Sequence, residues 1–292
     1  MSGHPPKTAA KVPPGLHFIA TPIGAARDIT LRALDILAGA DVLAAEDTRT
    51  LRHLMEIHGV ALGARPLVAY HDHNGEAARP RLLAWLAEGK SVAYASEAGT
   101  PLVADPGFQL GRAAIAAGHP VLAAPGPSAV LAALTVSGMP SDRFLFAGFA
   151  PPAAKARRDW LADLSQVQAT LIFYESPNRL ADFLATAAEV LGGDRRAVVC
   201  RELTKKFEEV IRAPLSQLAE TFSDRPVKGE IVVLIDRPGE RRSDDDTIRA
   251  ALVDALGRMK VKEAAGLIAE LHGLPRRDVY QMALDLAGAK DK

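Results

Sequence analysis

Short apolar runs alternate with longer segments of helical spacing along the first half of the chain. The runs are LHFIAT, DVLAAE, PLVAYH, SVAYAS and PVLAAPG, and each is followed by an amphipathic stretch. Strands that alternate with helices in this way are typical of βαβ units, which build a mostly parallel sheet. We therefore predict an N-terminal α/β domain over residues 15–130, preceded by a disordered tail over residues 1–14.

A second series of apolar runs has a different spacing. RFLFAGF, ATLIFYE, RAVVCREL, FEEVIRAPL and GEIVVLIDR lie closer together, and helical segments separate only some of them. This pattern predicts a C-terminal α/β domain with a mixed sheet over residues 131–238. The polar run Arg237 to Thr247 contains Pro and Gly, which indicates a linker. The rest of residues 239–292 predicts a module of three short helices, the middle pair resembling a helix-turn-helix.

Composition narrows the class of protein. The 292 residues carry 35 basic and 35 acidic side chains, so any contact with nucleic acid must come from local patches. No apolar run approaches the roughly 20 residues that a membrane span requires. The first fifteen residues also lack the apolar core of a signal peptide. We expect a cytoplasmic protein that does not enter a membrane.

The one cysteine, Cys200, lies in the apolar run RAVVCREL. A single cysteine excludes an internal disulfide and a zinc site built from cysteines, and we expect no metal site. We expect Cys200 to be a buried strand thiol and not a nucleophile.

Five loops follow the strands of the N-terminal domain. They are TPIGAARD, EDTR, HDHNG, SEAGTPLVADPG and PGPSA. Ligands of open parallel sheets gather at the carboxyl ends of the strands, and Gly24, Gly99 and Gly126 let a ligand approach the main chain closely. GxxxxGK[ST], GxGxxG after the first strand and HExxH are missing, which removes the best evidence for ATP hydrolysis, dinucleotide binding and zinc proteolysis.

Eight motifs stand in an order that resembles the tetrapyrrole methylase superfamily. They are ATPIGAARDITLRAL, AAEDTR, SEAGTPLVADPG, PGPSA, FAGFAPP, FYESPNRL, RELTKKFEE and KGEIVVLI. More narrowly, they resemble its bacterial branch that methylates a cytidine 2′-hydroxyl in the RNA of the small ribosomal subunit. The resemblance covers Leu16 to Asp236, and the C-terminal helices resemble a small appendage that some members carry.

This resemblance implies S-adenosylmethionine as the methyl donor, held in a cleft between two α/β domains, and a homodimer. Backbone amides and carbonyls of glycine-rich loops suit its carboxylate and its sulfonium cation. Glu97 stands where the family usually has Asp, GAARD replaces a more usual Gly-Asn-Leu stretch, and Gly75 stands where Glu is common. Matching the motifs assigns the donor site to Pro22, Gly24, Ser96, Glu97, Ala98, Gly99, Thr100, Asp105, Ser128 and Ala129, with Lys228 and Gly229 from the second domain.

Transfer to a ribose hydroxyl is an in-line displacement, so alignment supplies most of the catalysis and a base assists. The candidate groups are Glu46, Asp47, His71, His73, Glu175, Glu202, Lys205, Lys206 and Glu208. From these we select Asp47, Glu175 and Lys205 as catalytic residues. The structural alternatives are that Asp47 caps the helix beginning near Thr48 and that the charges of RELTKKFEE pair on a solvated strand.

Contact with RNA requires basic groups. Arg49 and Arg52 follow the second strand, and Lys155, Arg157 and Arg158 follow GFAPP, so we select these five as phosphate contacts. A solvated helix face is the other interpretation of KARR.

The sequence thus predicts an S-adenosylmethionine-dependent methyltransferase that acts on a cytidine 2′-hydroxyl of 16S ribosomal RNA in the small subunit. The alternatives are a methylase of a corrinoid or porphyrin macrocycle and a non-catalytic RNA-binding factor of ribosome assembly. Lys260, Lys262, Arg276 and Arg277 of the C-terminal helices suggest that this module docks the substrate, with a packing role as the alternative.

Overall fold

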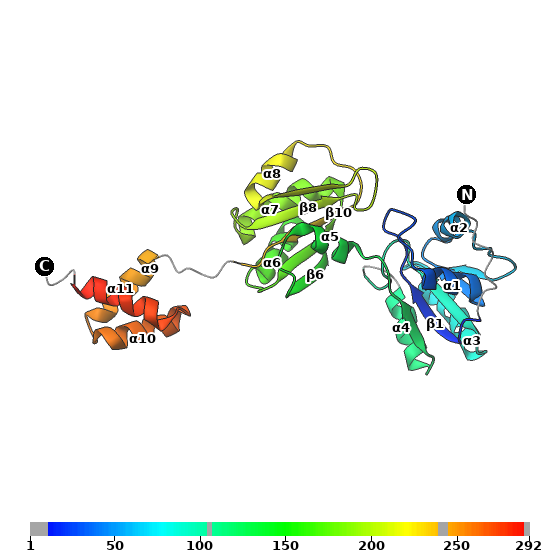
Figure 1. The fold of residues 1–292 in the computed structure, drawn as a ribbon, viewed down its shortest axis with the longest axis horizontal. Helices are drawn as coiled ribbons and strands as arrows, with labels where there is room; N and C mark the ends of the chain where they lie inside the picture. The colour runs from blue at the N-terminus through cyan, green and yellow to red at the C-terminus, as the bar shows by residue number, and fades with distance from the viewer. Residues whose placement is uncertain (1–10, 104–106, 239–244, 289–292) are drawn as a thin grey trace. The chain divides into compact units, whose positions relative to one another are not determined.

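The computed structural model describes residues 11–103, 107–238 and 245–288. Its two compact units divide between Arg237 and Pro238. The larger unit contains two five-stranded sheets, and the part of the smaller unit that is described is helical (Figure 1). None of the helices in these ranges is long and apolar enough to cross a membrane.

All five strands of the first sheet are parallel, in the order β3-β2-β4-β1-β5. Their bounds are β1 (Gly15–Ile19), β2 (Val42–Ala45), β3 (Leu67–Ala69), β4 (Ser91–Ala95) and β5 (Val121–Ala124). The parallel sheet predicted from the alternating pattern is confirmed. It forms because each strand is an almost continuous apolar run, which suits a sheet covered on both faces.

Two pairs of helices cover the two faces of this sheet. The helices are α1 (Leu31–Gly39), α2 (Thr48–Ile57), α3 (Gly75–Ala87) and α4 (Gly107–Ala116). Leu37 of α1 and Met55 of α2 belong to one core cluster, whereas Leu82 of α3 and Leu110 of α4 belong to another. The chain therefore changes face between α2 and α3.

This change of face locates the binding edge of the sheet. From β1 the chain moves toward β2 on one side, and from β4 it moves toward β5 on the other. The loops after the neighbouring strands β1 and β4 therefore separate at a topological switch point, where open α/β sheets hold their ligands.

The second sheet is mixed, as its strand spacing predicts, in the order β6-β7-β10-β8-β9. Only β6 and β7 are parallel, and the other pairs are antiparallel. The strand bounds are β6 (Phe144–Phe149), β7 (Thr170–Glu175), β8 (Arg196–Arg201), β9 (Glu209–Pro214) and β10 (Ile231–Ile235).

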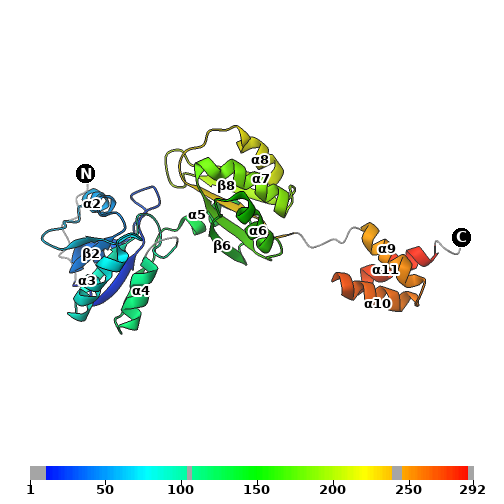
Figure 2. The same ribbon diagram turned by 180° about the vertical axis from the view of Figure 1, so that it is seen from behind.

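Helices cover both faces of the second sheet. On one face lie α6 (Ala154–Leu164), α7 (Leu180–Leu191), which follows the short η1 (Pro177–Arg179), and α8 (Leu215–Ser223). On the other face, α5 (Ala129–Ser137) packs through Val130 and Ala133 against β8 and β10 (Figures 1 and 2). Ile23, from the loop after β1, joins this same cluster. The first domain thus contributes an apolar side chain to the core of the second.

The smaller unit is a three-helix group made of α9 (Asp245–Leu256), α10 (Val261–His272) and α11 (Arg276–Gly288), which Figures 1 and 2 show packed on one another. Its core contains Leu252, Ile268 and Val279. The helix α9 begins at Asp245, inside the stretch that the sequence predicts to be a linker. The three predicted helices are confirmed.

The N-terminal segment and Cys200 can both be compared with what the sequence predicts. Residues 1–10 of the predicted tail lie outside the described residues, but Val12 is buried, so packing begins before residue 15. Cys200 is fully buried in β8, and burial raises the pKa of its thiol to about 12. The prediction of an inert strand thiol is confirmed.

Candidate functional site

A cavity of about 700 Å³ lies between the carboxyl edge of the first sheet and the second sheet. This volume falls in the range of sites that bind nucleoside-sized molecules. Four of the five predicted loops reach it, and the second domain contributes strand ends and the loop after β8. The lining residues are Pro22, Ile23, Gly24, Glu46, Thr50, Glu97, Ala98, Gly99, Thr100, Val103, Ser128, Ala129, Phe149, Tyr174, Glu175, Ser176, Pro177, Leu203, Lys205, Gly229, Glu230, Ile231 and Val232.

The loop HDHNG does not reach this cavity, because β3 is an edge strand of the sheet. Its residues His71, Asp72 and Gly75 line a separate hollow of about 290 Å³. The candidate bases His71 and His73, which were not selected from the sequence, are therefore not part of the cavity lining.

The loops after β1 and β4 are joined at the switch point. Thr21 and Gly99 exchange two backbone hydrogen bonds of 3.0 Å, and the Ser96 hydroxyl donates to the Gly99 carbonyl at 2.8 Å. Gly99 has φ +78°, and a Cβ there would lie 3.3 Å from Cγ2 of Ile23. A side chain at Gly99 would therefore be strained and would crowd the cavity wall.

A further bond ties the β4 loop to the β5 loop. The Thr100 hydroxyl donates to the Pro127 carbonyl at 2.8 Å. Directly afterward, α5 begins at Ala129 with Ser128 as its N-cap, and no hydrogen bond of the Ser128 side chain caps the helix. The first turn of a helix presents backbone N–H groups and partial positive charge, which suits a carboxylate ligand.

The second domain contributes a tight turn after β8. Glu202 has φ +53° and Thr204 has φ +64°, a left-handed conformation that is costly for both residues. Carboxylates hold the turn: Oε2 of Glu208 accepts from the Thr204 amide at 2.6 Å, and Oε1 of Glu202 accepts from the Glu230 amide at 2.9 Å. The alternative interpretation that charges of RELTKKFEE pair holds for Lys205 and Glu202, but on a turn and not on a flat strand face.

This turn touches the first domain directly. The Ala25 amide donates to the Thr204 hydroxyl at 3.1 Å. A Cβ on Gly24 would lie 2.5 Å from Cγ of Lys205 and 2.6 Å from Oγ1 of Thr204. Only glycine permits this approach, so Gly24 is required where the two domains meet.

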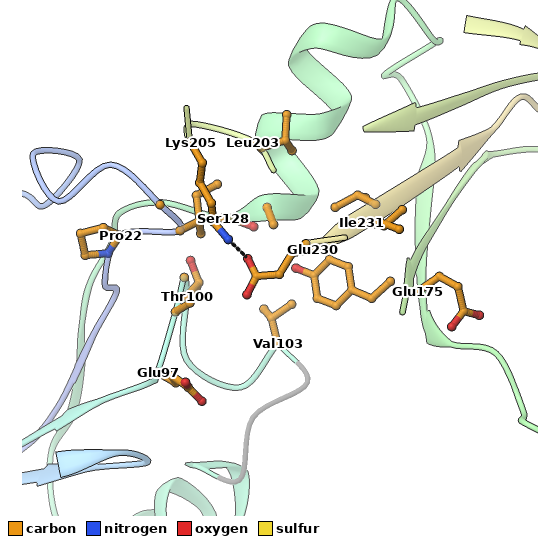
Figure 3. Close-up of a pocket in the computed structure, with 18 of the residues that line it drawn as sticks. Pro22, Glu97, Thr100, Val103, Ser128, Glu175, Leu203, Lys205, Glu230 and Ile231 are labelled. Atoms are coloured by element: carbon orange, nitrogen blue, oxygen red, sulfur yellow. Dashed lines mark hydrogen bonds and ion pairs between the residues drawn. The ribbon is translucent and has the colours of Figure 1, made fainter. Parts of the chain in front are cut away.

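A charged network occupies the same side of the cavity. The Lys205 ammonium lies 2.9 Å from Glu202 Oε1 and 2.9 Å from Glu230 Oε2, and Figure 3 shows its side chain directed at Glu230. Burial opposes the charge on Lys205, but hydrogen bonds to the two glutamates outweigh burial and raise its pKa. Lys205 is therefore a fixed cation at neutral pH and does not serve as a base.

Most residues assigned to the donor site do line the cavity, and three require comment. Ser96 is buried behind it, where its hydroxyl holds Gly99. Lys228 does not line it, and the Lys228 carbonyl accepts a hydrogen bond from Arg201. Asp105 lies outside the described residues. In the first domain, the Glu46 carboxylate accepts from the backbone amide of Glu97 at 3.3 Å, and both residues line the cavity.

Asp47 is the N-cap of α2 and does not line the cavity. Its Oδ1 accepts from the Arg49 amide at 2.7 Å, and its Oδ2 accepts from the Arg49 guanidinium at 2.8 Å. Hydrogen bonds from Arg49 and from the Thr50 amide lower the pKa of Asp47 to about 2. This carboxylate is too weak a base to attract the proton of an alcohol, and the helix cap that the sequence suggested is confirmed.

Glu175 lies at the end of β7, but its side chain is 0% exposed. Figure 3 shows it directed away from Lys205 and Glu230. Burial raises the pKa of its carboxyl. The hydrogen bond from the Ser176 amide and the charges of Arg179 and Arg157 lower that pKa, but burial outweighs them. Backbone and not carboxylate therefore faces the cavity here, which removes the geometric basis for Glu175 as a base.

The five predicted phosphate contacts are not equivalent. Arg157 is 6% exposed and donates to the Thr186 hydroxyl and the Pro152 carbonyl, so α6 turns it into the protein. Arg158 forms an ion pair with Glu189. Arg49, Arg52 and Lys155 remain exposed. Arg157 is therefore not available for a phosphate.

Glu230 is not among the site residues predicted from the sequence, although it belongs to the motif KGEIVVLI. Glu230 is 70% exposed, lines the cavity and bonds to Lys205. No local pattern distinguished it, because exposed acidic residues are common at the ends of strands. Within the described ranges, no group of His, Cys, Asp and Glu is arranged to hold a metal ion.

Comparison with known proteins places this geometry in a family. The family model for tetrapyrrole (corrin/porphyrin) methylases matches residues 15–219, which hold the first sheet, every strand of the second sheet except β10, and most of the cavity lining. The chain belongs to the tetrapyrrole methylase family. The family membership and the two-domain α/β fold that the sequence resemblance implied are confirmed. A second family model, described as the RsmI C-terminal HTH domain, matches residues 242–287 of this methylase.

Curated relatives of this methylase share its full length. Proteins named ribosomal RNA small subunit methyltransferase I are 47% identical over 98% of this chain and 97% of the relative in Mesorhizobium japonicum, and 42% identical over 94% and 96% in Escherichia coli O157:H7. Similar solved structures have lower identity. The methyltransferase CobJ aligns with a TM-score of 0.59 at 20% identity, covering 78% of this chain and 96% of its own.

A uroporphyrin-III C-methyltransferase from Thermus thermophilus, solved with S-adenosylhomocysteine, aligns with a TM-score of 0.53 at 19% identity and covers 75% of this chain and 96% of its own. At such identity these structures establish the fold alone.

We expect Thr204→Val to loosen the contact between the domains, because valine keeps the shape of threonine and removes the acceptor for the Ala25 amide. Loss of one hydrogen bond costs about 1 kcal/mol, so exchange of the Ala25 amide should accelerate about fivefold. Hydrogen exchange followed by mass spectrometry measures this. Thr204→Ser keeps the hydroxyl and should behave as wild type, and equal Ala25 protection in both variants would contradict the contact.

Proposed function

We propose that this methylase transfers a methyl group from S-adenosylmethionine to the 2′-hydroxyl of a cytidine in the 16S RNA of the small ribosomal subunit. The observation that carries the proposal is similarity over nearly the whole chain to relatives named for small-subunit ribosomal RNA methylation. That similarity includes the region of the C-terminal helices. The corrinoid and porphyrin enzymes cover only about three quarters of the chain.

The cavity suits the donor chemically. Main-chain groups of residues 22–24, 98–100 and 128–129 would hold its polar parts, and the close approaches at Gly24 and Gly99 exclude a side chain at those two positions. Ile23, Val103 and Leu203 offer apolar surface for a purine ring. The carboxylates of Glu46, Glu97 and Glu230 give the cavity negative charge that complements a sulfonium cation.

When bound, S-adenosylmethionine supplies a methyl group on a positively charged sulfur. The residues of this chain must then bring the hydroxyl oxygen into line and dispose of its proton. Lys205 presents a fixed positive charge where an oxyanion would develop, and Glu230 offers the nearest exposed carboxylate to accept the proton. We therefore assign the acceptor hydroxyl to the side of the cavity near this pair.

Exposed cations near the cavity support an RNA substrate. Arg49 follows the cap of α2, close enough to Glu97 for their charges to interact, and Thr50 next to it lines the cavity. Arg52 lies on the same helix, and Lys155 begins the exposed part of α6. These three would contact phosphates on either side of the target nucleotide.

Exposed apolar side chains support a homodimer. Phe144, Leu145 and Phe149 are exposed on β6, an edge strand of the second sheet, and Leu131 is exposed on α5. A second copy would cover this apolar surface, which a monomer would leave in water. A molar mass in solution equal to one chain would contradict the dimer.

Transfer of radiolabelled methyl distinguishes the three candidate functions. Small ribosomal subunits from cells that lack the gene, protein-free 16S RNA, uroporphyrinogen III and a precorrin are each supplied with labelled donor. The proposal expects label on RNA alone, recovered after digestion as 2′-O-methylcytidine. Label on a macrocycle supports the corrinoid or porphyrin alternative, and tight RNA binding without any transfer supports a non-catalytic assembly factor.

We expect Gly99→Val to abolish donor binding, because a β-branched side chain at φ +78° would strain the loop and meet Ile23. Calorimetry with S-adenosylhomocysteine should show at least a hundredfold loss of affinity. Gly118→Val is the matched control, since Gly118 has the same φ and nothing within 4 Å of its Cβ position. Unchanged affinity in folded Gly99→Val would move the donor elsewhere.

We expect Lys205→Met to lower the rate of methyl transfer by about a hundredfold, the typical effect of losing one electrostatic or acid–base group. Affinity for S-adenosylhomocysteine should change by less than fivefold, because the lost charge acts on the acceptor. The control is Lys206→Met, because the Lys206 ammonium lies 5.5 Å from the Phe207 ring centre and does not line the cavity. Equal rates for the two variants would remove Lys205 from the chemistry.

A further inference from the structure

The C-terminal helices have an uneven distribution of charge. Acidic residues slightly outnumber basic ones between Asp245 and Gly288, so the module has no general attraction for polyanions. Its cations nevertheless gather on particular helix faces, and those faces decide what the module can bind.

On α11 the basic and aromatic side chains share one flank. Arg276, Tyr280 and Leu284 are spaced by four residues, and Arg277 stands three residues before Tyr280. Residues three and four apart lie on the same side of a helix. All four side chains are exposed.

The flank continues onto α10 at Gly266. A Cβ on Gly266 would lie 3.4 Å from Nη2 of Arg276, so the guanidinium lies across α10 where that helix has no side chain. Lys262 is exposed one turn before Gly266 on the same side. We call these residues the basic flank: Lys262, Arg276, Arg277, Tyr280 and Leu284.

The acidic residues of α11 lie on another side. The acidic residues are Asp278 and Asp285. Gln281 lies three residues after the first and four before the second, and its amide donates to the Asp285 carboxylate at 3.2 Å. No ion pair of Lys262, Arg276 or Arg277 is found within residues 245–288 as described. The three cations thus keep their charge free for a partner.

Lys260 does not belong to this flank. It stands two residues before Lys262, which places it about 200° away around the helix axis. Its backbone amide donates to the Glu263 carboxylate at the start of α10. The four cations that the sequence grouped in one docking surface therefore divide, with Lys260 on the other side.

We propose that the basic flank docks the sugar-phosphate backbone of the RNA substrate, a step that rests on the proposed function. Two arginines offer forked donors for phosphate oxygens, and Lys262 adds a third positive charge. Tyr280 and Leu284 provide an apolar strip that fits against ribose or an unstacked base. The strip is too narrow for the large apolar face by which a helix enters a membrane surface.

The expected effect follows from counterion release. Each phosphate contact contributes a slope of about 0.7 to 0.9 in a plot of the logarithm of the binding constant against the logarithm of salt concentration. Removing two contacts should reduce the slope by about 1.4 to 1.8 and weaken binding at 0.1 M salt by about 25-fold to 60-fold. A packing role would change neither quantity.

The test compares two double variants of the full chain. Arg276→Gln with Arg277→Gln removes two charges from the flank, and Arg258→Gln with Lys260→Gln removes two charges elsewhere in the module. Binding to protein-free 16S RNA and to small ribosomal subunits is measured between 0.05 and 0.3 M salt. Over this range the Debye length falls to roughly half. Circular dichroism checks that both variants keep their helices.

The proposal expects the flank variant to lose affinity and slope while the control variant stays near wild type, with S-adenosylhomocysteine affinity unchanged in both. Equal RNA binding in the two variants overturns it, even where wild type methylates the RNA. If wild type neither binds nor methylates any RNA, the proposed function itself fails. If the flank variant alone loses its helices, Arg276→Lys with Arg277→Lys, which keeps both charges, must restore the salt slope, and failure to do so overturns the proposal.

Discussion

The contact between Gly24 and the turn after β8 is the constraint on which the rest of the site depends. Cγ of Lys205 and Oγ1 of Thr204 approach so closely that no Cβ fits at Gly24. Both partners of the contact continue into the cavity wall, one as residues 22–24 and the other as Leu203 and Lys205. A displacement of either would therefore change the shape of the cavity and the position of its cation together. This coupling explains why the turn tolerates two left-handed residues that are not glycine.

One network of charges serves both the turn and the chemistry. Glu202 accepts hydrogen bonds from the Glu230 amide and from Lys205, so the carboxylate that stabilises the turn also fixes the ammonium in the cavity. Hydrogen bonds to Lys205 and to the Glu230 amide lower the pKa of Glu202. Its stabilising contribution is thus complete above its ordinary pKa and is lost as the pH falls through the lowered value. The network is intact at neutral pH.

The fold of this methylase and its proposed choice of substrate rest on different parts of the chain. The two-sheet fold is shared with the methyltransferase CobJ and with a uroporphyrin-III C-methyltransferase, at identities that establish architecture only. Exposed cations stand outside the cavity lining, on α2, α6 and the C-terminal helices. If the proposed function is correct, selection of RNA depends on these exposed cations, while the shared loops hold the donor.

The sequence by itself determined the ten strands and the parallel and mixed character of the two sheets, and it offered the cap at Asp47 as the alternative to a catalytic role. Each depends on neighbours within a few residues or on a local alternation of apolar positions. Only the tertiary structure showed that Arg157 points inward, because its burial depends on α7 packing against α6. Only the antiparallel pairing of Arg201 with Ile231 brings the turn after β8 beside Glu230, and this joins Lys205 to a residue 25 positions away. Contacts between distant segments have no local pattern, so the sequence named the motifs but the fold decided which side chains meet.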